Sequence, residues 1–247
     1  MKQNLNLFIH DIKGIFTDKK TIILIFFLTL LTIIICISFC FIVKSGNESL
    51  LNQLESISGI KDQNLFISFI INIYSFLFFT AFPFILGIVI ISYLKEFGEL
   101  ELMMLFPINR KFFFIEKVLC IFSISLLFCW ASILINSLIQ SAVMNVSFYF
   151  SKYKLLYALI VLPVWLFFIS CLTVLISASS KDSKSANQKS LILPFVLIIG
   201  VQLLLYMKVN VFSYTIVFLP LLIGLIGAFI LLIVLNRKFS IEKIIYN

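Results

Sequence analysis

The chain has 247 residues, of which 62% are hydrophobic and 12% charged, and its formal net charge is +8. Soluble domains are about 45–50% apolar and about 25% charged, so this composition excludes the soluble, disordered and disulfide-scaffold classes. The single histidine, His10, excludes any site built on several histidines. Together with a mean hydropathy of +1.17, these values predict an integral membrane protein.

Residues 1–20 predict an amphipathic helix. Apolar side chains recur at helical spacing with polar side chains between them, and the apolar ones are Leu5, Phe8, Ile9, Ile12 and Phe16. A helix of this pattern lies in the membrane interface with its polar face in water. We therefore expect an interfacial helix before the first span.

Six stretches of the remaining sequence are long and apolar enough to cross a membrane. A transmembrane helix needs about 20 apolar residues to cross about 30 Å of hydrocarbon. The fold class predicted is all-α integral membrane, with a single transmembrane domain over residues 1–247. The six transmembrane helices are expected at residues 21–43, 65–94, 118–143, 155–180, 190–207 and 213–236.

The distribution of Lys and Arg predicts the orientation. Of the 19 basic residues, 14 fall in four segments: residues 1–20, 95–117, 181–189 and those after 236. Basic residues accumulate in cytoplasmic segments, so this distribution predicts that both termini are cytoplasmic. The net charge is then a topology signal and does not call for a nucleic-acid partner. The outer loops, including residues 44–64, are too short for a folded domain.

The loop between the second and third predicted spans is the most informative segment outside the membrane. An apolar run at residues 102–106 is too short to cross the bilayer, and Pro107 is expected to end it because proline disfavours helical geometry in the preceding residue. Asn109 is a suitable cap for the third span. Two interpretations remain open, a solvated amphipathic loop and a docking element for a soluble partner.

Several kinds of chemistry are excluded by missing motifs. The sequence contains no phosphate-binding G-x-x-x-x-G-K-[ST] motif, and the six apolar stretches contain no charged residue. Ion-coupled transporters place charged residues at mid-membrane, so their absence disfavours that class. The cysteines show no metal-binding spacing and are predicted to be small buried hydrophobes: Cys36, Cys40, Cys120, Cys129 and Cys171. No catalytic residue, metal ligand or cofactor is predicted.

Two amides are the candidate residues for a substrate path. Asn136 and Gln140 lie one turn apart and share a face of the third span. Amides in membrane helices commonly hydrogen-bond to a neighbouring helix, so both packing and a place in a substrate path are considered. Gly224 and Ala228 form a small-xxx-small pair, which permits close helix contact within the chain or between subunits.

The sequence at residues 96–110, followed by Phe114-Ile115-Glu116-Lys117, resembles that of ABC-2 type permeases, the membrane subunits of bacterial ABC exporters. The similarity is to an acidic–Gly–Thr–Leu–Glu pattern, an apolar run, a proline–basic turn and a lysine that opens span three. Glu99 stands where the family usually has Thr. Residues 185–188 through Pro194, and the layout of six spans with an interfacial helix, also resemble this family.

The resemblance implies a non-catalytic transport subunit in a bacterial plasma membrane. The loop after span two would form a cytoplasmic coupling helix that inserts into a separate ABC ATPase, present in two copies. A second six-span permease, identical or different, would complete the complex around a hydrophobic or amphipathic cargo such as a peptide, a lipid-like molecule or a drug. The residues carried over for the ATPase contact are Glu96, Gly98, Glu99, Glu101, Leu102 and Arg110.

Two other function classes compete with the transport subunit. A self-contained secondary transporter or channel is the alternative, and it would work without a partner ATPase. A membrane enzyme is the third class, but the predicted spans contain neither an acid–base pair nor a set of metal ligands.

The charge distribution yields a topology prediction. In a chain without its native cysteines, Ser49→Cys should react with a membrane-impermeant thiol reagent added outside intact cells, and Ser183→Cys should not. Lysed cells provide the control, because both positions should then react. Labelling of both positions in intact cells would contradict the six-span order.

Overall fold

The computed structural model describes residues 12–17, 19–45, 79–92, 110–144, 155–180, 185, 188–189, 222–231 and 233. Within these residues the chain is almost entirely helical and contains no strand, as the sequence predicts. The long elements are α2 (Lys19–Lys44), α7 (Arg110–Met144) and α9 (Leu162–Ser179). A π-helical turn, η1 (Ile88–Ser92), ends the helix that starts at Phe79, and another, η2 (Tyr157–Val161), leads into α9.

Among the residues that the structure describes, three helices are long and apolar enough to cross a membrane: Thr21–Ile42, Phe113–Met144 and Tyr157–Ser179. The first and third match the spans expected at 21–43 and 155–180. Phe79–Ile91 and Leu222–Leu231 are shorter apolar helices inside the stretches 65–94 and 213–236. The stretch 190–207 lies outside the described residues, and six spans remain a prediction.

The start of α7 differs from the prediction, which placed a span at 118–143. The helix begins at Arg110 and has 35 residues, so at 1.5 Å per residue it is about 52 Å long, against about 30 Å of hydrocarbon. Phe113 and Phe114 explain the earlier start, because both are buried and their rings meet edge to face at 5.5 Å. Glu116 and Lys117, assigned to a loop from the sequence, lie inside this helix and are buried.

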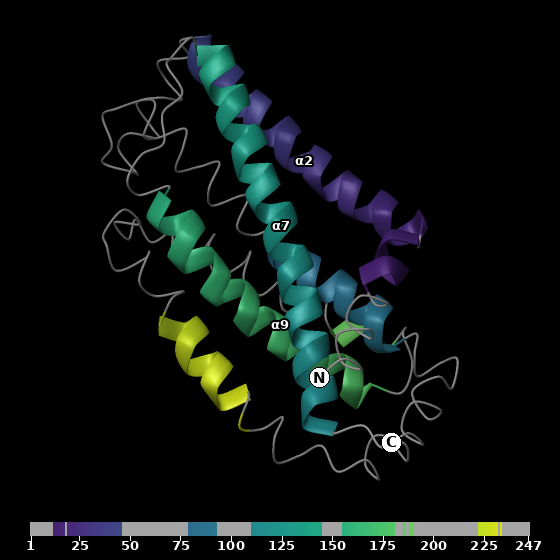
Figure 1. Ribbon diagram of the computed structural model, residues 1–247. Coiled ribbons are helices and arrows are strands. Elements are labelled where there is room, and N and C mark those ends of the chain that lie inside the picture. The colour runs from purple at the N-terminus through teal and green to yellow at the C-terminus, as the bar shows by residue number, and fades with distance from the viewer. Residues whose placement is uncertain are drawn as a thin grey trace.

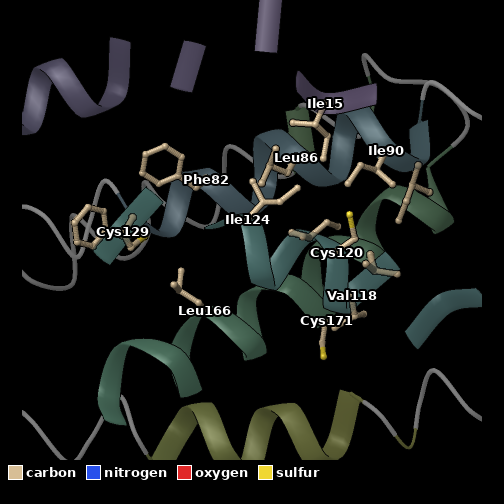
Figure 2. Packing of buried hydrophobic residues seen from close by; sticks show 14 of the residues in the cluster. Ile15, Phe82, Leu86, Ile90, Val118, Cys120, Ile124, Cys129, Leu166 and Cys171 are labelled. Carbon is tan, nitrogen blue, oxygen red and sulfur yellow. The ribbon is translucent and has the colours of Figure 1, made fainter. Parts of the chain in front are cut away.

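Helix α7 is the central element of the described structure (Figure 1). Its C-terminal half meets α2, where Lys44 Nζ donates a hydrogen bond to the Val143 carbonyl oxygen at 3.0 Å. Its N-terminal half packs in the core between α9 and the helix that starts at Phe79. Figure 2 shows Leu86, Ile124 and Leu166, one from each of these three helices, among the buried residues of this core.

The relative directions of the helices follow from pairs of contacts. The Phe82 and Phe128 rings stack at 6.1 Å, and a side chain at Gly87 would approach Ile121, so the helix that starts at Phe79 is antiparallel to α7. Helix α9 is also antiparallel to α7. In that pair, Trp130 Nε1 donates to the Ala158 carbonyl oxygen at 2.9 Å, and the Phe122 and Phe167 rings lie 5.6 Å apart.

Contacts also fix the direction of α2 and of the last described helix. Cys36 and Lys44 contact α7 at Asn136 and Val143, so α2 runs parallel to α7. Gly224 and Gly227 contact α9 at Val164 and Phe168, so the helix Leu222–Leu231 runs parallel to α9. If successive spans cross the membrane in alternating directions, spans one and three run one way and spans two, four and six run the other way. The five described helices have these directions.

The N-terminal segment is helical at residues 12–17, but its buried side chain was not the expected one. Ile15 is 2% exposed and belongs to the core, with the half-buried Ile12 beside it, whereas Phe16 is 53% exposed. The predicted apolar face omitted Ile15 because spacing alone does not reveal which side of a short helix meets its neighbours. Residues 1–11 lie outside the described residues.

Small residues mark two close approaches between helices. Gly224, from the predicted small-xxx-small pair, packs against Val164 and Trp165 of α9, so this contact is made within the chain. At Gly87, an added methyl group would overlap Cγ2 of Thr173 on α9. All five cysteines are buried, as predicted, and none of them forms a disulfide.

The Gly87 contact predicts a compensating pair of substitutions. Gly87→Ala should lower the thermal stability of the protein in nanodiscs, because overpacking a well-packed interior costs about 1–3 kcal/mol. Thr173→Ser removes Cγ2 but keeps the hydroxyl that donates to the Ile169 carbonyl oxygen at 2.7 Å, so the double variant should regain most of the loss. Equal stability of the single and double variants would show that this methyl group does not set the helix spacing.

Candidate functional site

Three polar side chains on α7 are buried without a hydrogen-bond partner in the described part of the structure. They are Ser125, Ser132 and Asn136, with exposed fractions of 0%, 3% and 2%. Neither serine Oγ, and neither Oδ1 nor Nδ2 of Asn136, takes part in a hydrogen bond. Spacings of seven and four residues put the three on one face of the helix, and we call them the polar column.

The polar column differs from most other hydroxyl groups of these helices, although the buried Ser177 hydroxyl of α9 is also without a hydrogen bond. Most of them donate to the carbonyl oxygen three or four residues earlier in their own helix, a common arrangement for serine and threonine in apolar surroundings. Ser137 does this to Ile133 at 2.6 Å, and Ser170 does it to Leu166 at 2.7 Å. The Ser125 and Ser132 hydroxyls make no such bond, so they remain available to another group.

Leaving these groups unpaired is unfavourable. A buried donor or acceptor without a partner costs about 1–3 kcal/mol, and Asn136 contributes one of each. A feature with this cost is expected where it serves a second conformation or a ligand. The polar column is therefore the candidate functional site.

Helix α2 covers the C-terminal end of the polar column, at Asn136. Cys36 Sγ donates to the backbone carbonyl oxygen of Asn136 at 3.5 Å. Val143, seven residues after Asn136 and thus on the same face of α7, packs against Cys36 and Cys40. The face of α7 that carries the polar column thus meets α2 at Asn136, whereas near Ser125 the same part of α7 meets the helix Phe79–Ile91, where the Phe128 ring stacks on Phe82.

The structure separates the two amides proposed from the sequence. Asn136 is buried at the contact between α2 and α7, but the interhelical hydrogen bond expected of its side chain is absent from the described residues. Gln140 is half-buried and lies one turn further along α7. Asn136 therefore belongs to the polar column, and Gln140 lies one turn beyond its C-terminal end.

Most of the proposed coupling residues fall outside the described part of the chain. Arg110 is the first residue of α7. The other five, namely Glu96, Gly98, Glu99, Glu101 and Leu102, lie outside the described residues, so their role stays a prediction.

Sequence reasoning missed two features of α7. Lys117 is fully buried, with Nζ 4.8 Å from the centre of the Phe113 ring, a cation–π contact, and Glu116 beside it is 9% exposed. Both residues lie just before the charge-free stretch, so the sequence pattern assigned them to the loop and did not predict their burial. Ser125 and Ser132 were not singled out, although their spacing from Asn136 was a readable signal.

Metal binding receives no support from the described residues, which contain no group of three or more His, Cys, Asp or Glu side chains able to hold an ion. We compared the sequence with protein-family models and curated proteins, and the structure with solved structures, and no match was found. The similarity to ABC-2 type permeases therefore rests on the sequence pattern quoted above.

The unpaired amide predicts a gain in stability on its removal. Asn136→Leu should raise the thermal unfolding temperature in nanodiscs, because an apolar side chain of similar size removes two unpaired polar atoms worth about 1–3 kcal/mol each. Ser137→Ala is the control and should give no gain, since the Ser137 hydroxyl is already bonded. A loss of stability in Asn136→Leu would mean that the amide has a structural partner.

Proposed function

We propose that this chain is the membrane subunit of an ABC exporter, in which ATP hydrolysed on a separate subunit moves a cargo across a bacterial plasma membrane. The observation that carries the proposal is the continuity of α7. The segment that resembles a coupling helix ends where α7 begins, at Arg110, and the same unbroken helix continues to the polar column.

A long helix is well suited to transmit a displacement from a cytoplasmic partner. Because α7 is longer than the hydrocarbon is thick, its first turns extend beyond the membrane when its outer end lies at the opposite surface. The core packing of Val118, Ile121 and Ile124 makes this part of α7 move together with α9 and the helix that starts at Phe79. A movement imposed on α7 near Arg110 would therefore also displace Asn136.

The remaining assignments follow from the family resemblance. Two ATPase copies and a second six-span permease, identical or different, would complete the exporter. The cargo would be hydrophobic or amphipathic, and this chain would perform no catalysis. From Val118 to Met144, α7 contains no charged residue, which supports a cargo path without ion coupling over the alternative of a secondary transporter.

Leu102→Asp tests the proposed ATPase contact. We expect the Leu102 side chain to enter an apolar cleft of the ATPase, where an unpaired carboxylate is highly unfavourable. A loss of about 1.4 kcal/mol already weakens binding tenfold, so co-purification of a co-expressed cognate ABC ATPase should fall sharply. Membrane insertion should be unchanged, because residue 102 lies outside the predicted spans.

Leu50→Asp, in the predicted outer loop, is the matched control and should retain ATPase binding. If Leu102→Asp binds the ATPase and exports normally, the loop is a solvated connector and the exporter proposal loses its main support. ATP-independent, gradient-driven transport by the chain alone would instead favour a secondary transporter.

A further inference from the structure

We propose that α2 is a movable cover over a binding site for neutral, amide-bearing cargo, and that the polar column of α7 forms this site. The proposal rests on the proposed transport function and gives it a substrate class and a moving element. Ser125, Ser132 and Asn136 would bind the cargo when α2 separates from α7.

Helix α2 is the least buried of the three long apolar helices that the structure describes. Only 18% of its membrane-spanning window is buried, against 44% for α7 and 50% for the span that includes α9. Elements with few buried contacts open at the lowest free energy. Figure 1 shows α2 beside α7 at their C-terminal ends and further from it towards Lys19.

The buried face of α2 is narrow and carries small side chains where it meets α7. Thr32, Cys36 and Cys40 recur every four residues and are buried, whereas Phe26, Phe27 and Ile34 on other faces are more than half exposed. The Thr32 hydroxyl donates to the Thr29 carbonyl oxygen of its own helix at 2.7 Å, so it does not pair with the polar column. Separation of α2 would thus bring the polar column to the cargo without breaking any hydrogen bond of its three side chains, although the bonds from Cys36 Sγ and Lys44 Nζ to backbone carbonyl oxygens of α7 would break.

The chemistry of the polar column selects the cargo. Two hydroxyls and one primary amide donate and accept hydrogen bonds, and an amide pairs with a peptide group in both directions. No charged side chain of α7 lies between Val118 and Met144, so an ionised group would lose its hydration without a counter-charge. The ligand class is therefore a peptide segment with neutral backbone amides and apolar side chains.

The first experiment locks α2 in place. The variant keeps Cys36 and has Ala at the other four native cysteine positions. Ile139→Cys supplies the thiol to be linked to Cys36, because Ile139 packs against Cys36 and Cys40. Ser132→Cys is the reporter, whose reaction with a thiol reagent is measured. A short bifunctional thiosulfonate should link Cys36 to residue 139 in nanodiscs, and mass spectrometry identifies the linked peptides. We expect the lock to slow modification of the reporter by a small thiol reagent about tenfold, because modification follows the population of the open form.

A second lock provides the control. This variant has Ala at all five native cysteine positions and carries Val164→Cys and Gly224→Cys. Linking the two new thiols joins α9 to the helix Leu222–Leu231, because a side chain at Gly224 comes within 3.1 Å of Val164 Cγ1. This lock should leave the reporter rate unchanged, and reduction of the α2 lock should restore it. A reporter that never reacts, or one that both locks slow equally, overturns the moving cover. Ser125→Cys serves as the reporter if Ser132→Cys fails to fold.

The second experiment tests the cargo class with matched probes. N-acetyl-leucyl-leucinamide, which is neutral, should protect the unlocked reporter from modification, whereas the zwitterion leucyl-leucine should not. Asn136→Leu should abolish the protection. Equal protection by both probes, or protection that survives Asn136→Leu, overturns the assignment of the site.

Neither experiment uses an ATPase, so the results test this inference independently of the exporter proposal. Normal ATPase binding by Leu102→Asp would remove the exporter proposal and leave the labelling results intact. Unchanged labelling after locking would remove the cover and leave the ATPase contact intact.

Discussion

Close helix packing around the N-terminal half of α7 is the interaction on which the rest of the structure depends. Apolar side chains gain little by leaving lipid, so membrane helices associate through van der Waals contact at small residues and through hydrogen bonds. Gly87 allows the helix Phe79–Ile91 to pack closely against Thr173 of α9, and Gly224 allows the helix Leu222–Leu231 to pack closely against Val164 of α9. These approaches fix α9 and its neighbours around the residues that follow Lys117.

The same constraint explains why α2 is different. Its exposed faces carry large apolar side chains, which are as stable in lipid as in a protein interface. Its hydrogen bonds to α7 are made by Cys36 and Lys44, in the C-terminal parts of both helices. A helix held in this way can separate at modest cost, and the unpaired amide of Asn136 on α7 is the group that would gain from the separation.

Tertiary contacts, rather than sequence pattern, set the boundaries that the predictions missed. Spacing and charge placed a span near 118–143, but the burial of Phe113 and Phe114 continues α7 back to Arg110. Lys117 was read as a loop cation because charged residues rarely lie in apolar surroundings. The Phe113 ring beneath its ammonium group supplies a cation–π contact there, and no linear pattern reveals that pairing.

The sequence by itself determined the membrane class, the helical fold and the spans around α2 and α9, because length and hydropathy suffice to define a helix in hydrocarbon. It also identified Asn136, since an amide in an apolar stretch is visible without coordinates. Only the tertiary structure decided that Ser125 and Ser132 share its unpaired state, that Gly224 packs within the chain, and that α2 covers the Asn136 end of the polar column. Those facts depend on which helix faces which, and that choice is made by side-chain packing between segments far apart in the sequence.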